Sequence, residues 1–221
     1  MIPGISTIAG AAELAATWPA WAAFNRSLRN PERAQTLALH RSLENGGAAF
    51  MQAQGLTLRE DADSFRSKVP PMSWEDLEPW IQRVAEGEPS VLSRQPVVCF
   101  ERTTGSTGAN KLVPMTAGYL SELQAAVYPW MHDLMGQHRL LGTTSYWSIS
   151  AGARPMELSA GGIPIGVDSD ASFFGGLAGW GITTRMAVPP DVGQLPTMDA
   201  CRYATALHLL KAPNLGFISV W

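Results

Sequence analysis

The chain has 221 residues, of which 46% are hydrophobic and 16% are charged, and its formal net charge is −3. This composition predicts a globular protein with a sizeable core, and it lacks the excess of Lys and Arg that binding to nucleic-acid phosphates requires. No run reaches the roughly 18 apolar residues of a membrane span. The apolar N-terminal segment contains Glu13 and no preceding Lys or Arg. We therefore expect a cytoplasmic protein with neither nucleic acid nor membrane as a partner.

The two cysteines, Cys99 and Cys201, lie far apart and outside any CxxC or Cys/His spacing. Such a pattern predicts neither a disulfide framework nor a zinc site. The expected role of both is that of small buried thiols, and no metal ligands are assigned in the protein.

The first ninety residues carry helical signals. Apolar residues recur at helical spacing in two stretches, and Gly46-Gly47 can divide the second of them. Val69-Pro70-Pro71 predicts extended backbone, because proline disfavours the helical region for the residue before it. Ser73 is placed to cap the helix that follows. The predicted helices span residues 11–29, 32–54 and 74–86.

After Pro89 the pattern changes to short apolar runs bounded by Gly, Pro and Ser, which predict strands. Thr116 can cap a long helix to about His138. A glycine-rich segment around Gly175 and Gly179 is expected to be a surface loop. Strands are predicted over residues 96–100, 111–115, 145–149, 163–167, 183–188 and 216–221, and a further helix over 198–210. Together the elements predict an α/β fold in which N-terminal helices, about 1–92, pack on a mixed β-sheet, about 93–221.

One loop between two predicted strands has chemical content. It reads Thr103-Thr104-Gly105-Ser106-Thr107-Gly108-Ala109-Asn110-Lys111. Glycines let a backbone approach an anion, hydroxyls donate to phosphate oxygens, and a lysine adds charge. A Walker A loop does not fit, because Asn110 replaces its second glycine and Leu112 its magnesium-binding hydroxyl. From composition alone, a Ser/Thr/Gly hairpin loop without a ligand is an equal alternative.

The run from Phe100 to Thr116, FERTTGSTGANKLVPMT, resembles the phosphate-binding signature of acyl-adenylate-forming enzymes, which also lies between two strands. The preceding stretches FRSKVP, WEDLEPWI and AEGE, between residues 65 and 88, are similar to the segment before this loop in the GH3 family. The final LGFISVW is similar to a strand of the same family. Asn110 departs from the pattern, because many adenylating enzymes have proline there.

The resemblance implies the incomplete N-terminal part of the large domain of an adenylate-forming (ANL-type) enzyme, with the C-terminal part and lid domain absent. In this family ATP, with Mg²⁺, activates a small-molecule carboxylic acid as an acyl-adenylate, and an amino acid then accepts the acyl group through its amine. We therefore expect a truncated acid-amido synthetase. An acyl-CoA ligase of the same superfamily and a non-catalytic fragment are the alternatives.

The resemblance also implies the site residues, although no catalytic residue is assigned. The expected ATP phosphate shell consists of Thr103, Thr104, Gly105, Ser106, Thr107, Gly108 and Lys111. Lys111 can instead be a solvated charge, since residues alternate sides along the following strand. By residue type, Met131, Tyr146 and Trp147 are candidates for an apolar acid-binding pocket, and the resemblance implies that His132 borders it. The alternative for these four is an ordinary core or surface role.

Overall fold

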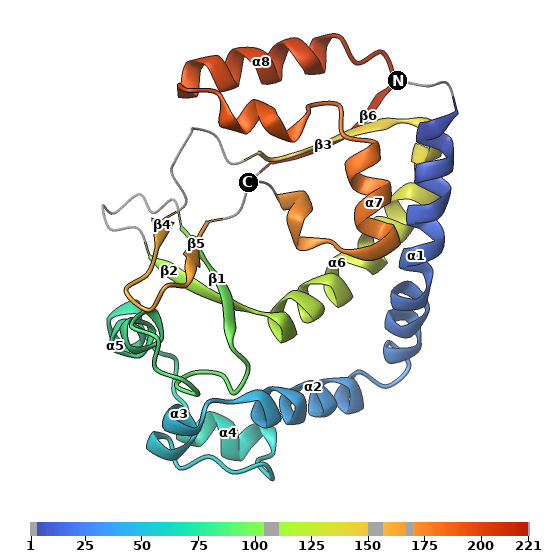
Figure 1. The fold of residues 1–221 in the computed structure, drawn as a ribbon. Coiled ribbons are helices and arrows are strands. Elements are labelled where there is room, and N and C mark those ends of the chain that lie inside the picture. Colours follow the sequence, from blue (N-terminus) through green and yellow to red (C-terminus); the bar gives the residue numbers. More distant parts are fainter. Residues whose placement is uncertain (1–3, 104–110, 150–156, 167–169, 221) are drawn as a thin grey trace. The chain divides into compact units, whose positions relative to one another are not determined.

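The structure is a computed structural model that describes residues 4–103, 111–149, 157–166 and 170–220. Contacts divide the chain into two compact units, and neither is continuous in sequence. Figure 1 labels their helices and strands. Unit 1 consists of Met1–Asn25, Glu122–Pro155 and Val167–Trp221, and unit 2 of Arg26–Ser121 and Met156–Gly166. Residue 92, where the predicted helical region gives way to the predicted sheet region, lies within unit 2.

The helices of unit 2 follow their local signals. The predicted break at Gly46-Gly47 is confirmed, since α2 ends before these glycines and α3 begins after them. Glycine is needed at Gly47, because a side chain there would collide with the backbone of Val91. Ser73 caps its helix as predicted and forms a reciprocal capping box with Asp76. One helix was not expected, and it begins after Asp61, whose side chain accepts a hydrogen bond from the Ser64 amide. The four helices are α2 (Pro31–Asn45), α3 (Ala48–Ala53), α4 (Ala62–Lys68) and α5 (Trp74–Ala85).

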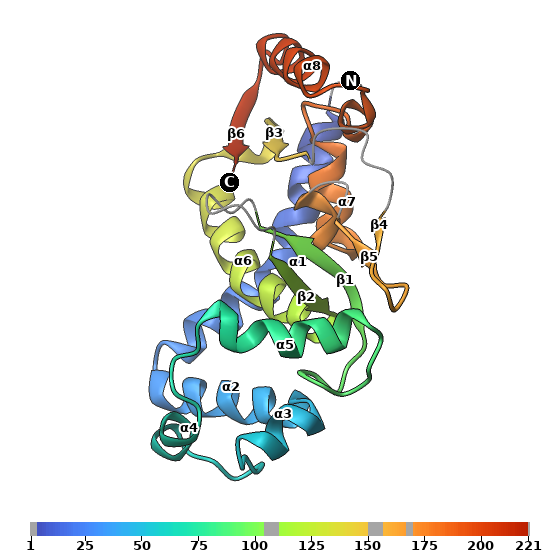
Figure 2. The same cartoon turned by 90° about the vertical axis from the view of Figure 1, so that its left-hand side faces the viewer.

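Unit 2 also contains a mixed four-stranded sheet, which confirms the predicted sheet type. Its strands are β1 (Val97–Arg102), β2 (Leu112–Thr116), β4 (Glu157–Leu158) and β5 (Pro164–Ile165), in the order β2-β1-β5-β4. β1 is antiparallel to β2 and parallel to β5. Helix α5 crosses the β1–β2 hairpin (Figure 2) and buries Ile81, Val84 and Ala85 together with Phe100, which is fully buried. This core fixes the hairpin against α5.

Unit 1 surrounds a two-stranded parallel sheet of β3 (Thr144–Trp147) and β6 (Leu215–Ser219). All four residues of β3 are buried. Trp147 packs in a cluster with residues of α6 (Ala117–Gln137) and α7 (Gly176–Thr184). Tyr146 belongs to a second cluster with η3 (Pro190–Gln194) and α8 (Met198–Leu210), as expected for neighbours on opposite faces of a strand. Helix α1 (Ile5–Ser27) and the short helices η1 (Leu140–Gly142) and η2 (Asp170–Phe173) complete the described elements.

Two predictions for unit 1 were wrong. The glycine-rich segment expected as a loop forms α7, and the strand expected over 183–188 is reduced to one bridge between Ser145 and Met186. The reason is tertiary: a Cβ on Gly181 would lie 2.8 Å from the Ala9 carbonyl oxygen, so a small residue is needed where the two segments pack closely. Glycine content suggested a surface loop, but Gly181 instead permits close packing of a helix.

The two cysteines differ in burial. Cys201 is buried and Cys99 half-buried, and both are free thiols.

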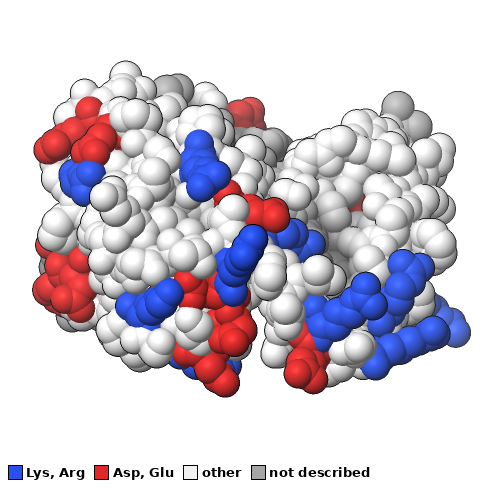
Figure 3. All heavy atoms as spheres, turned by 90° about the horizontal axis from the view of Figure 1, so that it is seen from below, with Lys and Arg blue, Asp and Glu red and all other residues white. Residues whose placement is uncertain are grey.

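None of the helices in the described part of the chain is long and apolar enough to cross a membrane. The face drawn in Figure 3 carries Lys and Arg as well as Asp and Glu side chains, with uncharged surface between them.

Candidate functional site

The candidate phosphate loop is closed at its base by the β1–β2 hairpin. The antiparallel register ends with Arg102 opposite Leu112, and one residue further the Thr103 amide donates to the Lys111 carbonyl oxygen at 3.0 Å. Thr103 and Lys111 are therefore adjacent across the hairpin. The other predicted members of the phosphate shell, Thr104, Gly105, Ser106, Thr107 and Gly108, lie outside the described residues.

Thr103 presents a hydroxyl that needs a partner. Its Oγ1 atom is buried and has no hydrogen-bond partner among the described residues. An unpaired buried hydroxyl costs free energy, so such groups commonly face a ligand or water. This observation fits a donor for an anion at the base of the loop.

Lys111 does not extend freely into solvent. Its Nζ atom lies 5.3 Å from the centroid of the Trp74 ring, in the range of a cation–π interaction. Hydrogen bonds from the Glu75 backbone and from Ser73 hold the pKa of Glu75 below its usual range, and the charge of Lys111 adds to this effect. The lysine is therefore held by the first turn of α5.

An ion pair fixes the end of β1 next to the loop. The guanidinium of Arg102 pairs with the carboxylate of Glu157 on β4. Arg102 is partly exposed and Glu157 is exposed, so solvent screens part of their attraction. The hairpin is thus tied on one side to β4 and on the other to α5.

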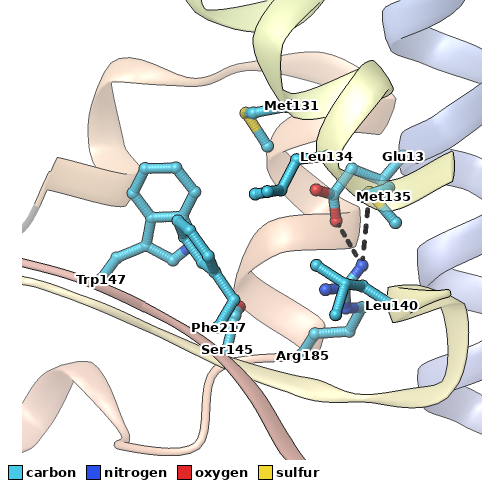
Figure 4. A pocket seen from close by; sticks show the side chains of 9 residues that line it. All are labelled: Glu13, Met131, Leu134, Met135, Leu140, Ser145, Trp147, Arg185 and Phe217. Carbon is cyan, nitrogen blue, oxygen red and sulfur yellow. Dashed lines mark hydrogen bonds and ion pairs between the residues drawn. The ribbon is translucent and has the colours of Figure 1, made fainter. Parts of the chain in front are cut away.

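Two of the four candidates for an acid pocket line a small pocket in unit 1. Figure 4 shows this pocket, and Met131 and Trp147 are among the side chains around it. It has room for about one water molecule. Tyr146 faces the other side of β3, and His132 is not part of the lining. The full lining is Glu13, Met131, Leu134, Met135, Leu140, Ser145, Trp147, Arg185 and Phe217.

His132 instead connects α6 to α1. Its Nδ1 atom lies 3.0 Å from the Leu14 carbonyl oxygen and 3.3 Å from the Thr17 hydroxyl. Its ring centroid is 5.1 Å from that of Trp21. A carbonyl oxygen only accepts, so Nδ1 carries the proton and donates to Leu14. This geometry gives His132 a structural role in unit 1.

The charged residues of the pocket escaped the sequence analysis. Arg185 Nη1 lies 3.0 Å from Glu13 Oε2, and both side chains are at least 96% buried. Burial raises the pKa of Glu13 to about 7 against the opposing charge of Arg185. Burial likewise lowers the pKa of Arg185. The one available signal was that Glu13 is the only charged residue among the first 25.

The sheet topology defines a mixed α/β fold in which the candidate loop is closed by an antiparallel hairpin. A solved structure of a GH3.15 acyl acid amido synthetase matches 90% of this chain and 35% of its own, with a TM-score of 0.66 at 18% sequence identity. The family model for the GH3 family N-terminal domain matches residues 20–221. The chain belongs to the GH3 family, and both the predicted family and the predicted fold class are confirmed.

Curated relatives carry activities in their names. A probable indole-3-acetic acid-amido synthetase GH3.12 of Oryza sativa subsp. japonica is 41% identical over 90 residues, which are 40% of this chain and 14% of that protein. The jasmonoyl-L-amino acid synthetase JAR6 of Nicotiana attenuata is 40% identical over 73 residues, 32% of this chain and 13% of that protein. The matches thus span less than a fifth of these relatives.

Proposed function

We propose that this chain contributes the phosphate-binding hairpin of an ATP-dependent synthetase that joins a small carboxylic acid to an amino acid. The observation that carries the proposal is the closure of residues 103–111 by β1 and β2 of a mixed sheet, within a GH3 family N-terminal domain. The similar proteins are named as amido synthetases for indole-3-acetic acid and jasmonate. These names favour an amino acid acceptor over coenzyme A.

ATP, when bound, supplies the adenylyl group that activates the acid and makes pyrophosphate the leaving group. The chain's part is to present fixed donors where negative charge develops on the phosphates. Thr103 fits this task because its hydroxyl is buried and lacks a partner among the described residues. In the proposal the hydroxyls of Thr104, Ser106 and Thr107 and the backbone of Gly105 and Gly108 complete this shell, with the Lys111 ammonium beside them.

Magnesium is proposed as a companion of the phosphates. Among the described residues, no group of three or more His, Cys, Asp or Glu side chains is placed to share a metal ion. In the proposal, Mg²⁺ would share the negative charge of the phosphate oxygens. We assign no described residue as a ligand of Mg²⁺.

The acid-binding role remains a proposal for Met131 and Trp147, which share one pocket. Its room for about one water molecule is far below the size of an indole acid. Binding of an acid there requires side chains such as Met131 to move aside, which the flexible thioether permits. We assign no contact with an acid to Tyr146 or His132, because each packs elsewhere.

The test is a titration of the chain with MgATP at millimolar concentration, followed by ³¹P NMR. Thr103→Val keeps the shape of the side chain and removes the hydroxyl, and it should weaken binding by about threefold to tenfold. Thr36→Val is the matched control, because Thr36 is exposed on α2 and donates to Glu32. Absence of MgATP binding by the unaltered chain, or equal binding by both variants, would contradict the proposal.

A further inference from the structure

We propose that Trp74 is a positioning residue for Lys111: the indole face holds the lysine ammonium at the base of the loop, where it meets the polyphosphate. The inference rests on the proposed function, because it takes the loop as the phosphate site. It adds a residue from α5, which lies 37 positions before Lys111, to the binding apparatus.

Two groups of the same helical turn act on the ammonium. Lys111 Nζ lies 5.3 Å from the Trp74 ring centroid. The neighbouring carboxylate of Glu75 interacts with the charge of Lys111. A ring face attracts a cation without occupying its N–H donors as a carboxylate oxygen would. Contact with the ring alone thus leaves the N–H donors of the ammonium for phosphate oxygens.

The platform that carries the ring is fixed. Ser73 and Asp76 close a capping box around the start of α5, so the backbone of Trp74 is held in the first turn. The indole also packs on the core around Phe100, as does Leu112. The base of the loop is fixed in turn by the 3.0 Å hydrogen bond from Thr103 to Lys111. The ring and the lysine backbone thus belong to one packed unit.

Positioning matters for lysine because its stem is flexible. A free lysine side chain loses rotamer freedom when its ammonium is immobilised on a ligand. A lysine already held on a ring has lost part of that freedom before the ligand arrives. The ring should therefore improve polyphosphate binding only when Lys111 is present, which separates positioning from a general structural role.

The experiment is a double-mutant cycle on the full chain, with Mg-tripolyphosphate and MgATP as probes and ³¹P NMR as the readout. Lys111→Met should weaken binding about tenfold, as expected for a charged donor. Trp74→Leu keeps an apolar side chain without the ring and should weaken binding by about twofold to fivefold. Trp74→Phe retains a ring and should bind nearly as the unaltered chain does. In the Lys111→Met background, Trp74→Leu should have no further effect.

The other possible outcomes distinguish failure of the positioning role from failure of the proposed function. Equal weakening by Trp74→Leu with and without Lys111 would show a structural role and overturn the inference. So would an unchanged affinity of Lys111→Met alongside a weakened Thr103→Val, and in that case the proposed function would stand. If the unaltered chain binds neither probe, both the positioning role of Trp74 and the proposed function are overturned. Urea denaturation of every variant separates these results from misfolding, because a variant that binds poorly must still unfold cooperatively to be counted.

Discussion

The buried pair of Glu13 and Arg185 sets two opposing electrostatic effects against each other. The carboxylate and guanidinium attract across 3.0 Å. Both have lost nearly all contact with water, and such desolvation can exceed the attraction. Burial raises the pKa of Glu13 from 4.5 to about 7, so desolvation is the larger effect. The perturbation that isolates it is Glu13→Gln, which keeps the shape of the side chain and cannot ionise.

The magnitude follows from the two pKa values. A rise from 4.5 to about 7 corresponds to on the order of 3 kcal/mol of folding free energy. The folded-state pKa lies above the unfolded value, so this stability is fully present below about pH 4.5 and is lost as the pH rises through about 7. Glu13→Gln should therefore match the unaltered protein near pH 4.5. At pH 8 it should be more stable, by up to that amount.

The assay is urea denaturation between pH 4.5 and 8, followed by tryptophan fluorescence, which includes the buried Trp147 beside the pocket. Glu122→Gln is the control, because Glu122 is exposed in the same unit and should leave the pH profile unchanged. A Glu13→Gln variant that is less stable at pH 8 by about 3–5 kcal/mol would refute the reasoning. It would mean that attraction to Arg185 exceeds the cost of burying both charges.

Three further predictions concern unit 2. Gly47→Ala should lower the unfolding free energy by about 1–3 kcal/mol, since the added methyl meets the backbone of Val91; urea denaturation measures this, and no change would contradict the close approach. Hydrogen bonds, of which the one from Lys68 has the largest effect, lower the pKa of Glu60 to about 2. The ionised Glu60 therefore contributes to folding stability above about pH 4.5, and this stability is lost as the pH falls toward 2. Glu60→Gln should remove that loss from thermal unfolding curves at pH 2–5, and an unchanged acid limb would count against it. Phe100→Ala should cost about 3–5 kcal/mol in the same urea assay, because Phe100 is fully buried, and a cost under about 1 kcal/mol would show that the core collapses around it.

Elements with local signals were predictable. Ser73 and Thr116 were identified as helix caps, and both accept the expected backbone hydrogen bonds. The helix over 198–210 has the predicted bounds. These successes share a cause, since a capping side chain and the amide it binds lie within three residues of each other. The flanking strands of the candidate loop were predicted from another local signal, their short apolar runs bounded by Gly, Pro and Ser.

Long-range partners were not predictable from spacing. Arg185 meets Glu13 across 172 residues, and His132 reaches the Leu14 carbonyl across 118. The residues around each of these side chains give no signal that predicts its distant partner. Likewise, Tyr146 and Trp147 were grouped by composition, but the pleat of β3 sends them into different clusters. Pocket membership depends on which face of an element a side chain occupies, and that is decided by packing.

The position of Lys111 shows why the two stretches that carry the family resemblance belong together. Residues 74–81 and the loop are separate in sequence, but α5 packs on the β1–β2 hairpin through a shared core. A packed interior transmits small displacements, because its side chains cannot shift independently. Substitutions on the buried face of α5, such as Ile81→Ala, should therefore disturb the loop base as well as stability. Glu78 lies on the exposed side of the same helix, outside this shared core.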